Sequence, residues 1–370
     1  MSLCLFLVAC SSESESGTGK VTNENPTDSS VTQVKDSAEK TIDRLTEQIR
    51  YSPKSWNLWY DRSLLWYEKG NTARAMEDIN KAIELHVMNP DGYHTRGFYY
   101  YVQNKDEEAL RDFKRAAEVG SDNPETFYHI GQIFFFRKDF SEAENAYGLA
   151  IKMDSMEPTY YFARGFMYEE QNKTDKAIGE YETAIKRNPF FIKALLALHD
   201  IYLLKKKNAD AAYAYNERVM QADSLHPMAH FNQGNFFIQR ANVITDELKA
   251  PEFEVLLKVA VSEFSKCLEQ DVNFVQAYYN RGYAWYLLAG YEKAMADFSQ
   301  VIELDPFNEK AFFMKASIQE FKGEYAAALS NYQQAFKLNP DFSDAEVAVK
   351  ELSARQEQKS EDASSEEAGS

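Results

Sequence analysis

Cysteine, glycine and proline are all scarce in this sequence, and each shortage excludes a class of protein. The three cysteines, Cys4, Cys10 and Cys267, are too few for a disulfide-stabilised miniprotein or a four-cysteine zinc site. With 15 Gly and 10 Pro in 370 residues, the chain lacks the frequent turns of a β-sandwich or a β-barrel. The apolar run at residues 1–10 is too short to cross about 30 Å of hydrocarbon as a helix. Collagens, disulfide miniproteins and polytopic membrane proteins are therefore excluded.

Positive charge is also in deficit, because 41 Lys and Arg oppose 58 Asp and Glu for a net charge of −17. A phosphate backbone would be repelled by such a chain, so we expect no nucleic-acid partner. The two polar ends, residues 11–40 and 353–370, carry −3 each, and the remaining −11 is spread over residues 41–352. This mild excess mainly favours solubility, with a modest bias toward basic partners.

Sequence motifs of catalysis are missing. The chain contains no G-x-G-x-x-G, G-x-x-x-x-G-K-[ST], H-E-x-x-H or G-x-S-x-G segment. His226 and His230 have i, i+4 spacing, but Pro227 places His226 at or before a helix start, and no further metal ligands can be assigned. Cys267 is expected to be a buried apolar residue. We therefore predict no enzyme, no cofactor and no metal; the alternative is an enzyme with an unrecognised site, for which clustered acids such as Glu169 and Glu170 would be the first residues to test.

A repeat of 34 residues organises most of the chain. Repeats begin at positions 56, 90, 124, 158, 192, 227, 275 and 309; six have 34 residues, the fifth has 35 and the sixth has 48. Five of them place glycine at the eighth position, all eight place alanine at the twentieth, and most place an aromatic residue at the eleventh and twenty-fourth. The fourth, seventh, eighth and eleventh positions share one face of a first helix, and the twentieth, twenty-fourth and twenty-seventh share one face of a second. Because glycine inside a helix costs about 1 kcal/mol relative to alanine, its recurrence predicts close helix packing.

This pattern resembles the tetratricopeptide repeat (TPR). The resemblance covers residues 56–342 and implies an all-α, right-handed superhelical solenoid of about eight helix-turn-helix units. Around this array we expect a signal segment at 1–10, a flexible polar tether at 11–40, an N-terminal helix at 41–55, a capping helix at 343–355 and an acidic disordered tail at 356–370.

In this family, ligands usually contact the second, fifth, ninth, twelfth and thirteenth positions of the first helices. Aromatic residues dominate these positions here, so the resemblance implies a concave groove for an extended peptide with apolar anchors. An alternative for each ring is packing against the adjacent repeat. The predicted groove residues are Tyr60, Tyr67, Phe98, Tyr101, Tyr128, Phe135, Phe162, Phe166, Phe231, Asn235, Tyr279, Tyr283, Tyr286 and Phe313.

Some relatives grip a C-terminal carboxylate with a clamp of Lys, Asn, Asn, Lys and Arg. Asn235, Asn280 and Lys310 occupy three of these five positions, but Phe231 and Met314 stand where the other two cations should be. We therefore expect no working carboxylate clamp.

The sixth repeat carries 14 extra residues near positions 239–258. Val243, Ile244 and Leu248 precede Pro251 in this insertion, and Phe253, Leu256 and Leu257 follow it or lie just beyond. This arrangement predicts that both helices of the hairpin are extended. The extension would contact a partner or pack against the chain itself.

The segment Leu7-Val8-Ala9-Cys10 resembles the lipobox of bacterial lipoproteins, in which the cysteine is lipidated. No Lys or Arg precedes Lys20, so we interpret residues 1–10 as an apparently truncated signal segment; a frayed apolar N-terminus is the alternative. Ser11 in place of Asp implies the outer membrane.

Together these features predict a non-catalytic scaffold for protein or peptide partners at the bacterial cell envelope. Lipid on Cys10 would hold it at the outer membrane, facing the periplasm or the cell surface. An alternative is an assembly or regulatory factor of an envelope machine for secretion, outer-membrane biogenesis or peptidoglycan synthesis.

Overall fold

The computed structural model describes residues 28–244 and 250–368. Every regular element in these ranges is a helix. The chain forms two compact bodies: an N-terminal body, Met1–Thr126, and a C-terminal body, Phe127–Ser370.

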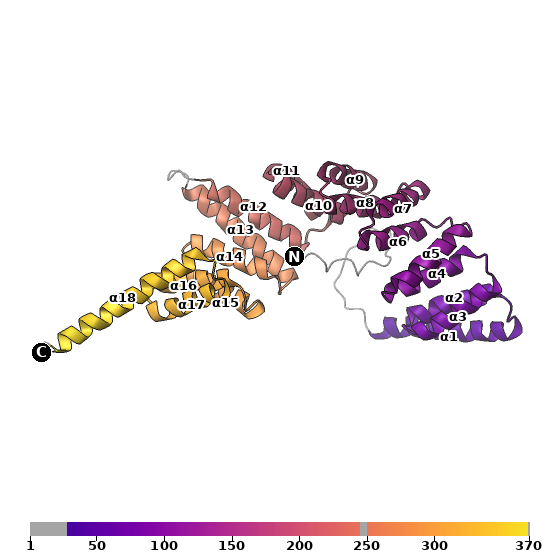
Figure 1. Cartoon of the computed structure of the whole chain (residues 1–370), viewed down its shortest axis with the longest axis horizontal. Helices are drawn as coiled ribbons and strands as arrows, with labels where there is room; N and C mark the ends of the chain where they lie inside the picture. The colour runs from indigo at the N-terminus through magenta and orange to yellow at the C-terminus, as the bar shows by residue number, and fades with distance from the viewer. Residues whose placement is uncertain (1–27, 245–249, 369–370) are drawn as a thin grey trace. The chain divides into compact units, whose positions relative to one another are not determined.

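The N-terminal body holds five complete helices and the first residues of a sixth. They are α1 (Asp28–Tyr51), α2 (Trp56–Glu68), α3 (Thr72–Leu85), α4 (Pro90–Val102), α5 (Asp106–Glu118) and the start of α6 (Pro124–Phe136). Helices α2 and α3 form the first repeat, and α4 and α5 form the second; each pair packs side by side (Figure 1).

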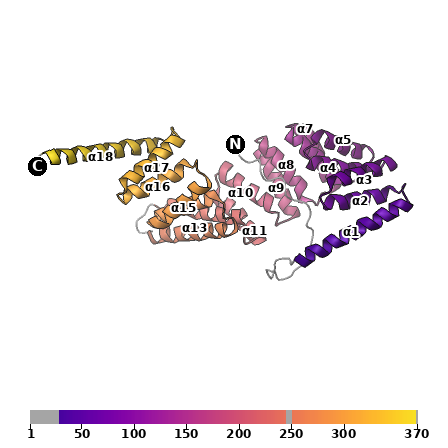
Figure 2. The same cartoon turned by 90° about the horizontal axis from the view of Figure 1, so that it is seen from below.

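The C-terminal body continues the same alternation. Its further elements are α7 (Phe140–Met153), α8 (Pro158–Glu170), α9 (Thr174–Arg187), α10 (Ile192–Asp200), η1 (Ile201–Lys205), α11 (Ala209–Ala222), α12 (Pro227–Asn242), α13 (Ala250–Gln270), α14 (Val275–Leu287), α15 (Tyr291–Leu304), α16 (Glu309–Phe321), α17 (Tyr325–Leu338) and α18 (Ser343–Ala368). Helix pairs such as α8–α9 and α16–α17 lie side by side in both views (Figures 1 and 2). The predicted all-α array of helix-turn-helix repeats is confirmed.

Local sequence explains where the helices begin and turn. Pro90, Pro158 and Pro227 open first helices, where the missing N–H of proline costs nothing. The turn inside seven of the eight repeats contains one residue with positive φ, a conformation that glycine and asparagine adopt most readily. These residues are Gly70, Asn104, Lys138, Asn172, Lys207, Ala289 and Gly323.

The glycine at the eighth position makes room for an aromatic ring from the second helix. A β-carbon added to Gly131 would lie 2.6 Å from the Tyr147 ring, and one added to Gly234 would lie 2.6 Å from the Phe264 ring. Both rings are fully or almost fully buried. The predicted close packing at these glycines is therefore confirmed, with the ring of the twenty-fourth position as the group that approaches.

The extra residue of the fifth repeat is absorbed in its first helix. Residues Ile201–Lys205 form a π turn, in which the Lys206 N–H donates to the Ile201 carbonyl oxygen over 3.0 Å. The second helix is consequently shifted by one residue, so that Ala212 and Asn216 are buried where the sequence pattern predicted Ala211 and Tyr215. The predicted register of this second helix was wrong.

The insertion of the sixth repeat lengthens both helices of its hairpin. Helix α12 has 16 residues and α13 has 21, against 13 and 14 in the repeat that follows. Leu257 is fully buried, and Phe253 and Leu256 pack against the same core cluster, whereas Val243 is 77% and Val255 59% exposed. The insertion thus packs on its own repeat and also presents apolar side chains to solvent; Leu248 lies outside the described residues.

Two predicted boundaries were wrong, because both terminal helices are longer than expected. Helix α1 begins at Asp28, inside the predicted tether, and α18 continues to Ala368, inside the predicted disordered tail (Figure 1). Neither extension contains proline or glycine, and the extension of α18 is rich in Glu, Gln and Ala, so polarity alone does not oppose a helix. Ile42, Leu45 and Ile49 of α1 are buried, as are Ala345 and Leu352 of α18. Residues 1–27, including Cys10, lie outside the described residues.

Candidate binding groove

All fourteen predicted groove residues lie on first helices, and all are partly buried. In the N-terminal body, the Tyr67 ring stacks on Tyr99 with centroids 4.5 Å apart, and the Tyr60 hydroxyl shares a 3.2 Å hydrogen bond with Thr95. Burial raises the pKa of Tyr60, Tyr67 and Tyr101, so these phenols stay neutral. Phe98 contacts Tyr67 edge to face. Tyr60 and Tyr67 of the first repeat therefore contact the first helix of the second repeat, and all four rings also keep some exposed surface.

In the third and fourth repeats the predicted residues form a connected aromatic cluster. Phe135 and Phe166 have centroids 5.6 Å apart, and Phe162 contacts both Phe166 and the Phe191 ring that precedes α10. Tyr128 lies 5.4 Å from Tyr160. The structure brings these residues together, but it uses part of their surface to join repeats.

Further along, several predicted rings pack against the next element of the chain. Phe231 stacks on Phe274 at 4.8 Å. Phe313 lies 4.8 Å from Phe342 and 5.2 Å from Tyr332, and Tyr286 contacts Tyr291. The packing alternative therefore accounts for much of the surface of these rings.

Three predicted residues, Asn235, Tyr279 and Tyr283, meet in an open pocket of about 340 Å³. Its wall also contains four residues that were not among the predicted groove residues. We call this site the amide pocket, lined by Leu203, Asn235, Ile238, Gln239, Tyr279, Asn280 and Tyr283. None of the seven side chains carries a formal charge, and burial raises the pKa of Tyr279.

Two asparagines from neighbouring repeats meet in this pocket. The Asn280 Nδ2 donates to Asn235 Oδ1 over 2.7 Å. Since each amide offers both donors and an acceptor, Asn235 Nδ2 and Asn280 Oδ1 keep hydrogen-bonding capacity that the described residues do not fill. The pocket can therefore donate one hydrogen bond and accept another.

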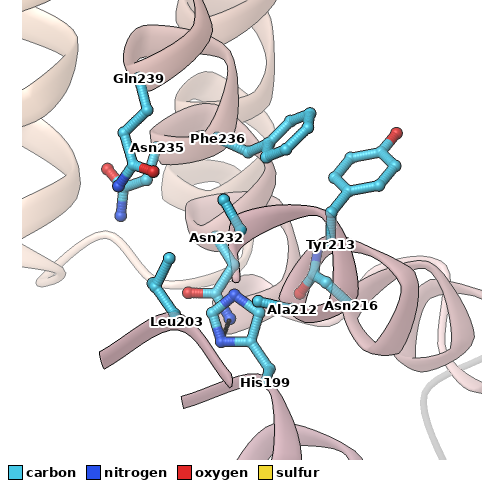
Figure 3. Close-up of a pocket in the computed structure, with 10 residues that line it drawn as sticks. His199, Leu203, Ala212, Tyr213, Asn216, Asn232, Asn235, Phe236 and Gln239 are labelled. Atoms are coloured by element: carbon cyan, nitrogen blue, oxygen red, sulfur yellow. Dashed lines mark hydrogen bonds between the residues drawn. The ribbon is translucent and has the colours of Figure 1, made fainter. Parts of the chain in front are cut away.

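A smaller chamber shares Leu203, Asn235 and Gln239 with the amide pocket (Figure 3). It measures about 20 Å³, enough for one water-sized group. Asn216 is 1% exposed, lines this chamber and has no hydrogen-bond partner at its Oδ1 among the described residues.

The chamber exists because the fifth repeat departs from the packing rule of the others. His199 stands at the eighth position, where five repeats have glycine, and Asn216 takes the place of the aromatic ring. His199 Nδ1 is 2.9 Å from Asp200 Oδ1 and 3.4 Å from Asn232 Nδ2. The His199 ring on the first helix thus takes the place of the aromatic ring that most repeats carry on the second helix. This exchange leaves the chamber, whose walls are partly polar.

The positions of a carboxylate clamp hold two apolar residues in place of two cations, as the sequence indicated. The Phe231 ring packs on Phe264 and Phe274, and Met314 packs beside Phe298, so neither position offers a cation. Only Lys310, which is exposed, supplies positive charge among the five positions.

One of the acids and one of the histidines noted in the sequence, Glu169 and His230, make structural contacts. Glu169 accepts hydrogen bonds from the Tyr181 hydroxyl and from Lys205 Nζ. His230 is buried between Glu263 Oε2, at 2.7 Å, and the Ser224 carbonyl oxygen, at 3.0 Å. Cys267 is fully buried, as predicted, and burial raises the pKa of its thiol to about 12.

Within the described ranges, no three His, Cys, Asp or Glu side chains are grouped as metal ligands would be. The same residues include no helix that is both long and apolar enough to traverse a bilayer.

Leu203, Ile238 and Gln239 were not among the predicted groove residues, although they occupy the twelfth or thirteenth positions of their first helices. The prediction was restricted mainly to aromatic residues at those positions, and these three side chains are aliphatic or amide. The one-residue excess of the fifth repeat was the available signal, because it shows where the inner face departs from the rule.

A family model described as tetratricopeptide repeat matches residues 162–227. A second model with the same description matches residues 124–155, 275–308 and 309–342. No curated protein sequence matches the chain. Among solved structures, PilF of Pseudomonas aeruginosa is 16% identical over 63% of this chain and 97% of its own, with a TM-score of 0.50. A tetratricopeptide repeat protein of Parabacteroides merdae is 16% identical over 71% of this chain and 98% of its own, with a TM-score of 0.46.

IFIT1, solved with Gppp-AAAA, is 14% identical over 89% of this chain and 81% of its own, with a TM-score of 0.49. Similarity at these identities concerns the fold alone. The absence of a nucleic-acid partner therefore stays a prediction. The family matches and the eight helical hairpins together make this chain a tetratricopeptide repeat protein, a class that generally serves as a protein-interaction scaffold rather than as an enzyme.

Proposed function

We propose that the protein is a non-catalytic scaffold that binds peptide or protein partners through its first helices, with the amide pocket as a main contact. The observation that carries this proposal is a pocket of about 340 Å³ formed by three successive repeats, with apolar walls and hydrogen-bonding groups still available. Such a combination of apolar surface and a few convergent polar groups is typical of ligand sites.

Photocrosslinking in the native cell tests this proposal. A benzophenone amino acid replaces Gln239, which is exposed at the rim of the pocket, and a matched variant carries it at Asn145, which is exposed on α7. We expect a discrete crosslinked partner from position 239 and none from position 145. Equal crosslinking from both positions, or none from either, would contradict the proposal.

We further propose that the scaffold works at the bacterial cell envelope, held there by lipid on Cys10. Support comes from the lipobox-like segment Leu7-Val8-Ala9-Cys10 and from the polar residues that follow it. Labelling with a radioactive fatty acid should be lost in Cys10→Ala and kept in the control Cys4→Ala. Labelling that persists in Cys10→Ala would remove the anchor from the proposal.

A further inference from the structure

We propose that one edge of the C-terminal body lies against an anionic lipid bilayer, with three apolar side chains at the level of the headgroups and the flanking Lys and Arg on lipid phosphates. We call this surface the turn edge. It consists of the turns 154–157, 188–191 and 223–226, which precede α8, α10 and α12, and of the helix ends beside them. The turn edge shares no residue with the amide pocket.

Each of these turns presents an apolar side chain two residues before the next first helix. Met156, Phe190 and Leu225 are 62%, 57% and 60% exposed. Large apolar side chains that meet water at the same place in three successive turns gain little from folding, and such patches mark contact surfaces.

The three turns are neighbours in the folded chain. Arg187 Nη1 lies 3.8 Å from Met156 Sδ, and Arg218 Nη2 donates to the Pro189 carbonyl oxygen over 3.1 Å. Each arginine thus joins its own repeat to the turn that precedes that repeat. The three apolar side chains therefore follow one another along a single edge.

Cations flank the middle turn. Segment 186–193 contains Lys186, Arg187 and Lys193 around Phe190, and it contains no acid. Lys186 and Lys193 are exposed and have no ion-pair partner among the described residues. In a chain with a net charge of −17 this is a local reversal of sign. Lys and Arg at such a place are attracted by anionic lipids, each by about fivefold in affinity.

The carboxylates of the turn edge are engaged by the backbone. Asp154 Oδ1 and Asp223 Oδ1 accept hydrogen bonds from the N–H groups of Met156 and Leu225, over 2.8 and 3.0 Å. Glu157 Oε1 accepts from a backbone N–H of α8 over 2.9 Å. The outer turns therefore contribute mainly apolar surface, and the middle turn contributes the positive charge.

This combination favours a bilayer over other anionic partners. An anionic membrane offers phosphates at its surface and, just beneath them, acyl chains that take up apolar side chains. A nucleic acid offers the phosphates alone. A second copy in a two-fold contact would bring the cations of one edge onto those of the other.

The turn between α15 and α16 provides a matched comparison within the same body. Its Phe307 is 76% exposed and has the repeat position of Phe190, and Lys310 has the repeat position of Lys193. Segment 303–310, however, contains three acids where segment 186–193 contains none. The two turns therefore share an exposed ring and differ in charge.

Co-sedimentation with vesicles tests the proposal, using the full chain with Cys10→Ala so that no acyl chain contributes. We expect binding to vesicles of equal parts phosphatidylcholine and phosphatidylglycerol, at least about tenfold weaker with phosphatidylcholine alone or in about 0.5 M NaCl. Phe190→Ser and Lys193→Gln should each weaken binding at least about threefold, and the matched Phe307→Ser and Lys310→Gln should leave it within about 1.5-fold. All four side chains lie at turns or helix starts with exposed surface, so the thermal melts should agree.

A fluorescent label locates the contact independently of affinity. Phe190→Cys, in a chain that also carries Cys4→Ala and Cys10→Ala, is coupled to an environment-sensitive dye; the remaining Cys267 is fully buried. The dye should brighten when the anionic vesicles are added, whereas the same dye on Phe307→Cys should not.

The proposal is overturned by equal losses in the two members of either matched pair, by equal binding to both kinds of vesicle, by brightening at both label positions, or by no binding at all. Tighter binding of soluble polyglutamate than of the anionic vesicles would assign the edge to an acidic protein instead. None of these results affects crosslinking from position 239 or fatty-acid labelling of Cys10, so the proposed scaffold function is tested separately.

Discussion

The guanidinium of Arg62 forms a two-pronged ion pair with Asp78, with Nε and Nη2 at 2.7 and 2.8 Å from the two carboxylate oxygens. The same pair, 16 residues apart, recurs as Arg96–Asp112 and Arg281–Asp297, and a variant of it as Arg164–Glu180. Each joins the seventh position of a first helix to the twenty-third position on the second helix of the same repeat. The pair is therefore a recurrent lock of the hairpin.

Breaking this lock on one side should be costly. Arg62→Met leaves the buried Asp78 carboxylate unpaired, and we expect a loss of about 3–5 kcal/mol in the stability of the first repeat. The double variant Arg62→Met/Asp78→Leu should regain most of it, because no buried charge remains. Lys81→Met, which breaks the exposed Lys81–Glu84 pair, should cost less than about 1 kcal/mol.

Urea unfolding combined with amide hydrogen exchange of α2 and α3 measures these changes. A loss in Arg62→Met no larger than in Lys81→Met would show that the pair is not a lock.

A serine in place of Gly148 should stabilise the third and fourth repeats. In the three Arg–Asp pairs the arginine Nη1 donates to a polar side chain of the preceding helix, such as Asn80 of α3 for Arg96, at 2.8 Å. Arg164 meets Gly148 instead, and a β-carbon there would lie 3.9 Å from its Nη1, without a clash.

Gly148→Ala should raise the free energy of unfolding by up to about 1 kcal/mol, because alanine has the higher helix propensity. Gly148→Ser should gain what the helix propensity of serine gives and, in addition, about 1 kcal/mol from the new hydrogen bond. Thermal and urea unfolding of the two variants compare them directly. If Arg164→Met leaves the gain of Gly148→Ser unchanged, the serine does not bond the guanidinium.

Restoring the usual packing of the fifth repeat needs two substitutions together. Asn216→Tyr alone should place a ring against His199 and destabilise the repeat, and His199→Gly alone should enlarge the chamber. The free energy of unfolding of the double variant should be at least about 1 kcal/mol higher than the sum of the two single effects predicts. Additive effects in this double-mutant cycle would mean that the two side chains do not occupy one shared space.

Acid should weaken the protein partly through His129. Burial lowers the pKa of His129 to about 4, below the value of about 6.5 that it has when exposed. As pH falls through about 6.5 the unfolded chain takes up a proton and the folded chain does not, so stability falls between about pH 6.5 and 4 and levels off below. The loss attributable to this residue is up to about 3 kcal/mol.

Urea unfolding at pH 7 and pH 4.5 measures this contribution. His129→Gln should show a smaller loss than the parent chain, whereas His86→Gln, at an exposed position, should match the parent. Equal losses in all three proteins would exclude His129 as a cause.

The sequence predicted the repeated features well, because each recurs often enough to stand out. Glycine opposite a ring, as at Gly131 and Tyr147, is visible in the sequence as a period of 34 residues. Pairs such as Arg62 and Asp78 also recur, but their adjacency depends on how two helices pack, which spacing alone did not indicate. The amide pocket was only partly predicted, because it arises where His199, Asn216 and the π turn break the period. A pattern derived from recurrence describes such exceptions least well.

The hydrogen bond that Nη1 of these arginines donates has a mechanical consequence. Arg96 Nη1 bonds Asn80, and Arg281 Nη1 bonds Ser265, so each guanidinium couples two successive hairpins of its own body. At Gly148 the corresponding acceptor side chain is missing. Under a pulling force, a hairpin boundary tied by such a bond resists shear, and the boundary at Gly148 yields at lower load. We therefore expect the boundary at Gly148 to be softer than the boundaries that Asn80 and Ser265 help to tie.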